Sequence, residues 1–190
     1  MRGEDSVTNE SMARQFGNPG VFGLATFGFA LAALSFQVLV NPEAAGATLY
    51  AILVAAIGET IAGMWAIARG DTYVAGILTT FGIWLFGFYM LRTQGEELGL
   101  VNPASEGAYV LLLIIPVVYL AIPAFRGGLW IFSVAFVALI AMLFFLGFGY
   151  YFENGMLRTI AGVLALIAAI PIFYLSYEEA AAEGPGAKSG

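Results

Sequence analysis

An acidic side chain inside an apolar segment is the first feature of this sequence that could do chemistry. Glu59 lies about twelve residues into a run that begins near Ala47 and stays free of other charges until Arg69. A helix over this run would carry the carboxyl group to the middle of a membrane, where a charge costs several kcal/mol unless it is paired or hydrated. Two readings follow. Glu59 exchanges protons beside a solute path, or it is neutral and ties neighbouring helices together.

The neighbours of Glu59 on a helix indicate what its face contacts. At helical spacing the carboxyl shares a face with Ala62, Gly63 and Ala66, which are small enough for a second backbone or a small solute to come close. We therefore predict that this face is a helix interface or the wall of a path. It is not predicted to face lipid.

Composition limits the chemistry that the whole chain can perform. Hydrophobic residues make up 61% of the chain and charged residues 11%, which is typical of an integral membrane protein. The sequence has no cysteine and no histidine, so thiol catalysis, iron-sulfur clusters and histidine-ligated metals are not expected. Lys188 is the sole lysine and lies in a polar tail, so no Schiff base is expected inside the membrane. We predict neither an enzyme nor a bound cofactor, and no nucleic-acid partner.

Apolar runs of about 20 residues match the hydrocarbon core of a bilayer. The sequence contains six, so an all-α six-helix bundle is predicted. We expect residues 1–17 to form a cytoplasmic tail, residues 18–177 the membrane domain and residues 178–190 a second cytoplasmic tail. The predicted spans are Pro19 to Val40, Ala47 to Ala68, Thr72 to Leu91, Ala108 to Phe125, Leu129 to Phe148, and Met156 to Ser176.

Basic residues predict how the bundle sits in the membrane. With six spans both termini fall on one side. Five basic residues are on that side and two, Arg92 and Arg158, are on the other. The excess predicts cytoplasmic termini and a cell inner (plasma) membrane location. The five on the terminal side are Arg2, Arg14, Arg69, Arg126 and Lys188.

Three motifs along the chain resemble the acetate uptake transporter family, which includes the succinate/acetate permease and the yeast ammonia/acetate exporters. NPGVFGL, from Asn18 to Leu24, is similar to the family signature NPAPLGL. AGMWAIARGDTY followed by TTFG is similar to its AGMxExxxGNTF and SYG segments. In the last span Ala161-Gly162, Tyr174 and Glu178-Glu179 fall at similar places. The resemblance covers about residues 17–179.

This resemblance implies a homohexamer in which each protomer has its own path for acetate, and in some members succinate. In the family, apolar and aromatic side chains on the first, third and fifth helices narrow the path. The positions that match along the motifs are Phe27 and Phe81, and Leu139 is the corresponding position on the fifth span. A small carboxylate and a proton are therefore the expected partners, alongside the lipid bilayer.

Departures from the family pattern bear on the solute. Phe81 stands where the family has Tyr, and Glu59 stands where it has Gln. A constriction without the phenolic hydroxyl is drier and favours a neutral acid over a hydrated anion. Because burial disfavours the charged form of a carboxyl, Glu59 becomes the predicted proton partner.

Two further polar residues are candidates for the substrate path. Asn18 is predicted to cap the first helix, with Pro19 at its first position, and could in addition donate to a carboxylate at the mouth. Thr80 offers a hydroxyl, although threonine in a membrane helix commonly bonds its own backbone.

Two other functions remain open from the sequence. A channel for urea, short amides or ammonia would use the same architecture and the same dry aromatic constriction. A membrane protein that transports nothing, such as an assembly factor or sensor, would have no continuous path through the protomer.

Overall fold

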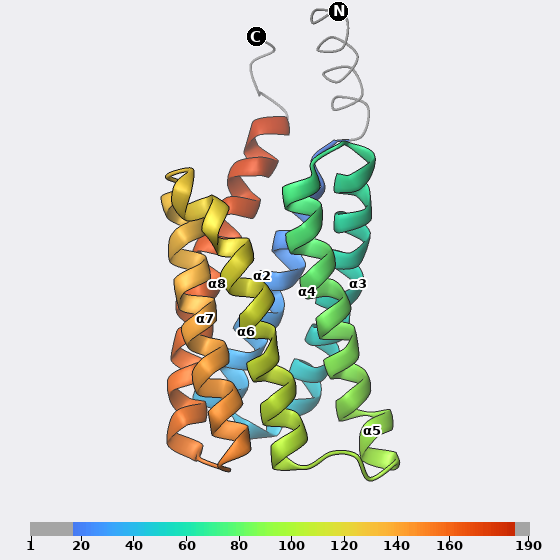
Figure 1. Ribbon diagram of the computed structural model, residues 1–190, viewed down its shortest axis with the longest axis vertical. Coiled ribbons are helices and arrows are strands. Elements are labelled where there is room, and N and C mark those ends of the chain that lie inside the picture. The colour runs from blue at the N-terminus through green and yellow to red at the C-terminus, as the bar shows by residue number, and fades with distance from the viewer. Residues whose placement is uncertain (1–16, 185–190) are drawn as a thin grey trace, which may run out of the picture.

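The described part of the chain is a bundle of α-helices. A computed structural model describes residues 17–184, and no strand occurs in that range (Figure 1). Six of its helices are long and apolar enough to cross a membrane. They are α2 (Pro19–Leu39), α3 (Ala45–Ala68), α4 (Thr72–Arg92), α6 (Pro103–Arg126), α7 (Trp130–Tyr151) and α8 (Gly155–Glu183). The predicted all-α fold with six long apolar helices is therefore confirmed.

The connections contain two short helices, η1 (Pro42–Ala44) and α5 (Gln94–Glu97), which hydropathy did not predict. The last helix also runs beyond the predicted end of its span at Ser176 and finishes at Glu183. Residues 177–183 are mostly Ala and Glu, which favour a helix but are too polar for an apolar window. Residues 1–16 of the first predicted tail, with Arg2 and Arg14, and residues 185–190 of the second, with Lys188, lie outside the described residues.

Asparagine and aspartate side chains begin four of the long helices. The side-chain oxygen of Asn18 accepts from the Gly20 N–H at 2.9 Å, and that of Asn102 accepts from the Ser105 N–H at 2.9 Å. Asp71 and Asn154 cap α4 and α8 in the same way. These caps satisfy backbone donors that a helix leaves unpaired at its start. They place the helix starts where the sequence predicted them to within a few residues.

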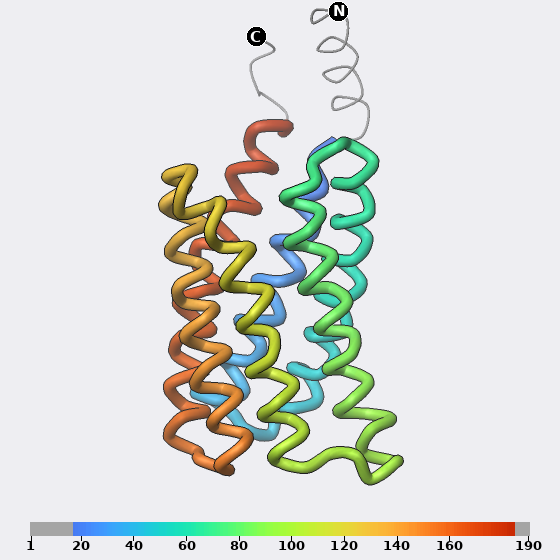
Figure 2. Tube along the Cα trace, in the orientation of Figure 1, coloured from blue at the N-terminus to red at the C-terminus, as the bar shows by residue number. Residues whose placement is uncertain are grey.

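The six helices are arranged as a ring. Along it the packing order is α4, α3, α2, α8, α7 and α6, and each helix packs extensively against the next. The ring closes between α4 and α6, where contact is sparse, and α2 is visible behind this seam in Figures 1 and 2. Side-chain hydrogen bonds bridge the seam: Trp84 Nε1–H donates to the Tyr109 carbonyl at 3.2 Å, and the Tyr109 hydroxyl donates to the Trp84 carbonyl at 3.0 Å.

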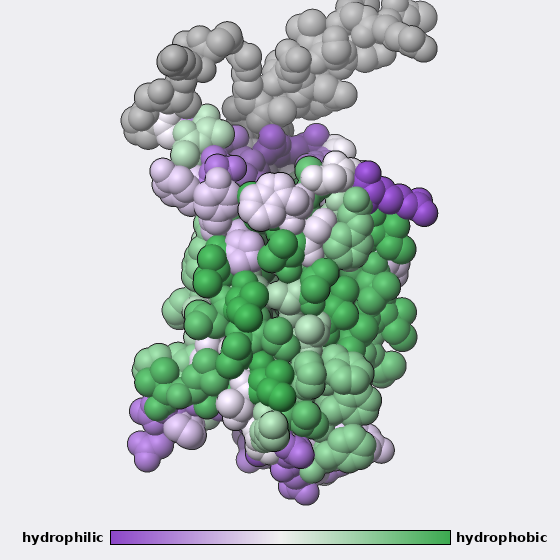
Figure 3. Space-filling model, turned by 90° about the vertical axis from the view of Figure 1, so that its left-hand side faces the viewer, coloured by the Kyte–Doolittle hydropathy of each residue, from purple (hydrophilic) through white to green (hydrophobic). Residues whose placement is uncertain are grey.

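The first and last described residues lie at the same end of the bundle. The Asn18 N–H donates to Glu183 Oε2 at 3.1 Å, which joins the start of α2 to the end of α8. We call this the terminal end and the opposite one the far end. Figure 3 shows a broad apolar band between polar side chains at the two ends, as expected for a surface in contact with hydrocarbon.

Candidate functional site

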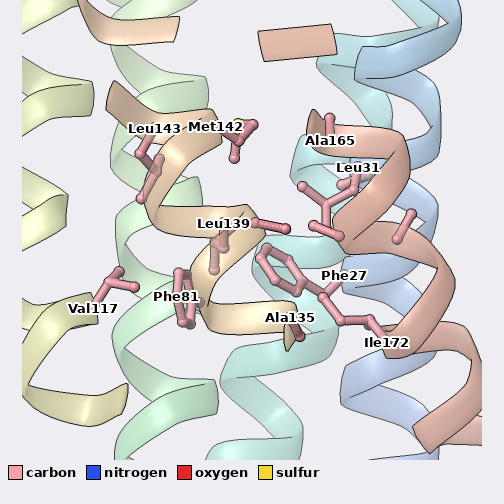
Figure 4. Close-up of a cluster of buried hydrophobic side chains, with 14 of the residues drawn as sticks. Phe27, Leu31, Phe81, Val117, Ala135, Leu139, Met142, Leu143, Ala165 and Ile172 are labelled. Carbon is pink, nitrogen blue, oxygen red and sulfur yellow. The ribbon is translucent and has the colours of Figure 1, made fainter. Parts of the chain in front are cut away.

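Three apolar side chains meet in the centre of the bundle. The rings of Phe27 on α2 and Phe81 on α4 have centroids 5.0 Å apart, inclined by 38°. Leu139 on α7 belongs to the same buried cluster, which Figure 4 draws, and all three side chains are less than one tenth exposed. The structure thus brings together the three residues at which the sequence predicted a constriction.

Two cavities meet at these three side chains. The larger, which we call the central cavity, has a volume of about 210 Å³ and extends from Phe27, Phe81 and Leu139 toward the far end. The smaller, which we call the inner cavity, has a volume of about 40 Å³ and lies on the terminal side. Their linings have only Phe27, Phe81 and Leu139 in common. The three side chains therefore separate two spaces that lie along the axis of the bundle.

The walls of the central cavity are mostly hydrocarbon. Leucine, alanine and aromatic side chains from α2, α4 and α7 form most of its lining, and polar groups gather toward the far end. Those polar side chains include Gln37, Arg92, Glu96 and Tyr150. A carboxylate could be held at the far end of this cavity, whereas the constriction offers it no polar contact.

Glu59 lines the inner cavity, which adjoins the constriction on its terminal side. Its side chain is 1% exposed, and its Oε2 atom has no hydrogen-bond partner among residues 17–184. Ala62, Gly63 and Ala66 are buried on the same face of α3, as the helical spacing predicted. Gly63 packs directly against Thr79 of α4. This face is a helix interface that leaves room at Glu59 for a small cavity.

Asn18 lies at the terminal end, away from the constriction. Its side-chain oxygen is occupied as the cap of α2, and its backbone N–H is occupied by Glu183. It lines neither the central nor the inner cavity. The structure accounts for Asn18 as a cap and does not join it to the three apolar side chains.

Thr80 lies on a different face of α4 from Phe81. It lines a separate cavity of about 500 Å³ at the seam between α4 and α6, together with Tyr109 and Pro116. It does not line the central or the inner cavity. Of the six predicted path residues, the structure therefore brings Phe27, Glu59, Phe81 and Leu139 together and leaves Asn18 and Thr80 apart.

An ion pair at the far end was not predicted as part of the site. Arg92 Nη1 donates to Glu106 Oε1 and joins the end of α4 to the start of α6. Arg92 also lines the central cavity. The sequence did hold a signal, since Arg92 is one of only two basic residues predicted on that side. Its partner, however, comes from a helix that contacts α4 only sparsely, which no local pattern reveals.

The arrangement suits passage of a solute better than bond chemistry. Within residues 17–184 no group of three or more His, Cys, Asp or Glu side chains is placed to hold a metal ion. The acidic and basic side chains of the described residues lie at the two ends and at Glu59, and the apolar constriction separates two aligned cavities. An apolar six-helix bundle with this interior has the architecture of a membrane channel or transporter.

Comparison with known proteins gives the family. Residues 5–185 match the model of the GPR1/FUN34/yaaH family, and the chain belongs to this family, the acetate uptake transporters that its motifs resemble. The fold is similar to that of the bacterial acetate channel SatP, with a TM-score of 0.79 and 21% sequence identity. The alignment covers 88% of this chain and 93% of SatP. A search among curated proteins found no match.

Proposed function

We propose that the chain is a membrane channel or transporter for acetate and similar small monocarboxylates. The observation that carries this proposal is the pair of aligned cavities that share only Phe27, Phe81 and Leu139. Membership of the family and the similarity to an acetate channel support it. The solute would enter the central cavity from the far end, pass the three side chains and leave beside Glu59.

The constriction determines the form in which the solute crosses. Its three side chains are hydrocarbon, and a carboxylate there would lose its hydration without gaining a hydrogen bond. A protonated acid avoids most of this cost. We infer that the acid crosses as the neutral species or together with a proton.

Glu59 is the residue that we assign to proton exchange. It is the only ionisable side chain in the lining of the inner cavity. The family pattern that the sequence resembles has Gln at this position, so a titratable group here is a feature of this chain. In its carboxylate form Glu59 can receive the proton that a crossing acid releases beside the constriction, so that the acid becomes an anion again and Glu59 becomes the neutral carboxyl group that burial favours. Asn18 would then serve only as a helix cap.

Assembly and orientation complete the proposal. We propose a homohexamer with both termini cytoplasmic in the cell inner (plasma) membrane. The orientation rests on the excess of basic residues on the terminal side of the chain. The hexamer rests on the family resemblance and on the many apolar side chains exposed around the bundle, such as Ile115 and Ile170, which can face lipid or other protomers.

Uptake of labelled acetate into proteoliposomes tests the function, with labelled urea as a second tracer. Protein-free liposomes give the background, because protonated acetic acid also dissolves in the bilayer. We expect acetate uptake above background that rises as the outside is acidified. Urea uptake without acetate uptake would favour the amide channel, and uptake of neither would contradict a transport function for these solutes.

A further inference from the structure

Arg92 stands where the central cavity meets a second space at the far end. This second space, which we call the mouth cavity, has a volume of about 430 Å³. The two cavities share part of their lining, namely Leu34, Gln37, Arg92, Leu146 and Tyr150. A solute that moves from the mouth cavity toward the constriction must therefore pass Arg92.

Two neutral polar side chains lie beside Arg92 in this shared lining. Gln37 of α2 and Tyr150 of α7 are both half-buried. Among residues 17–184, neither side chain forms a hydrogen bond, although nearby Thr48, Thr93 and Tyr109 all do. The amide of Gln37 and the hydroxyl of Tyr150 are thus free to donate to a bound molecule.

The guanidinium group of Arg92 also has hydrogen-bond donors that no described residue accepts from. It has five N–H groups in a fixed plane, and within the described range only Nη1 is engaged, by Glu106. Its side chain is 37% exposed, so the remaining donors are accessible. A planar fork of this kind matches a carboxylate group.

We propose that Arg92, Gln37 and Tyr150 form a binding site for the carboxylate of a small monocarboxylic acid in its anionic form. This proposal rests on the proposed function and adds to it a binding site that the solute occupies before it reaches the constriction. The methyl group of acetate would lie against Leu34 and Leu146, the apolar members of the shared lining. The site holds the anion, which predominates near neutral pH, at the entrance of the cavity that leads to the constriction, where it must become neutral to cross.

Acidic side chains near the site repel an anion and so limit the affinity of the site for acetate. Glu96 lines the central cavity, and Glu106 and Glu153 line the mouth cavity together with Arg158. Glu106 is the closest competitor, because it already occupies one donor of Arg92. Removal of its charge should therefore strengthen anion binding, whereas a merely structural ion pair would only be weakened by the same change.

Binding can be measured separately from transport by saturation-transfer NMR, with the protein in lipid nanodiscs and acetate as the probe. Neutral acetamide, which has nearly the same shape, is the comparison ligand. Glu106→Gln should lower the Kd for acetate. The double variant Arg92→Gln/Glu106→Gln, which replaces the partly buried ion pair by two neutral amides, should raise it about tenfold, the effect of losing a charge-assisted hydrogen bond. Neither change should alter acetamide binding to the same degree.

Arg158→Gln is the matched control, because it removes the same charge from the same end but from a residue that does not line the central cavity. Its Kd for acetate should stay within about threefold of the native value, since an exposed charge is screened by solvent. Equal losses in Arg158→Gln and the double variant would overturn the site, as would an unchanged Kd in the double variant. Acetate binding that depends on Arg92 in a protein without acetate uptake would uphold the site and reject the transport function instead.

Discussion

Glu59 is a carboxyl group enclosed almost entirely by hydrocarbon at the side of a small cavity. Leu78 and Ile172 are among the apolar residues that line this space with it, and the Oε2 atom has no hydrogen-bond partner among residues 17–184. A buried polar atom without a partner is uncommon, and a functional role is one of the recognised reasons for it. The proton role that we assign to Glu59 accounts for its presence at this position.

The substitution Glu59→Gln tests that role. Glutamine has nearly the same shape and cannot exchange a proton, so acetate uptake should persist while its dependence on pH flattens. Uptake is measured in proteoliposomes across a series of external pH values. If the variant and the native protein have the same pH profile, Glu59 holds the bundle together and carries no proton.

The residues of the site differ in how far the sequence could reveal them. Phe27 follows a motif, and Phe81 lies within one, that resembles those of a known family, so their meeting with Leu139 could be predicted. The roles of Arg92, Gln37 and Tyr150 could not, because they depend on three helices that converge at the far end. Tyrosine near the end of a span is typical of the membrane interface, which conceals any other use. Thr80 was misleading because adjacent residues on a helix point in different directions, and Phe81 alone faces the interior.

At the scale of elements, the packing of α3 against α4 depends on a glycine. A Cβ atom added at Gly63 would lie 2.7 Å from the backbone nitrogen of Thr79, which cannot move aside as a flexible side chain can. This close approach keeps the two helices in the position that holds Glu59 near Phe81. Small residues at membrane helix interfaces commonly serve this purpose.

Gly63→Ala should therefore destabilise the protein by about 1–3 kcal/mol, the usual cost of overpacking. Gly76→Ala is the matched control on α4, because a Cβ atom there would meet only Leu120 at 3.9 Å. Alanine also favours a helix over glycine by about 1 kcal/mol, so this control should be neutral or stabilising. Thermal unfolding in detergent, followed by tryptophan fluorescence, compares the two variants. A control that loses as much stability as Gly63→Ala would contradict the packing argument.

Hydropathy, with the one predicted cap at Asn18, predicted most of the fold at this scale. The six spans, the predicted starts at Pro19 and Thr72, and the predicted cap at Asn18 agree with the structure. The polar end of α8 was missed because an apolar window cannot extend over residues 177–183. The order of the ring and its loose seam at α4 and α6 could not be predicted, since all six helices are apolar around much of their circumference.

For the whole molecule, the proposed orientation makes a prediction about access from outside the cell. Glu43 lies in the connection after α2 at the far end, and Arg126 ends α6 at the terminal end. The sequence contains no cysteine, so single cysteines at these exposed positions can be labelled uniquely. A membrane-impermeant maleimide applied to intact cells should label Glu43→Cys and leave Arg126→Cys unlabelled until the cells are opened. The reverse pattern would place the termini outside.

The central claim is that the solute crosses within a single bundle, between Phe27, Phe81 and Leu139. The variant Leu139→Cys allows a direct measurement, because this position lines the central cavity and the native chain offers no other thiol. A small methanethiosulfonate reagent adds to the thiol and dithiothreitol removes it. Acetate uptake is measured in proteoliposomes before modification, after it and after reduction, with the native protein treated in the same way.

The account predicts that modification lowers acetate uptake by Leu139→Cys to the level of protein-free liposomes, that reduction restores it, and that the native protein is unaffected. The extent of labelling is read by mass spectrometry. Complete labelling of Leu139→Cys with unchanged acetate uptake would contradict the account, because the solute would then cross without passing this residue.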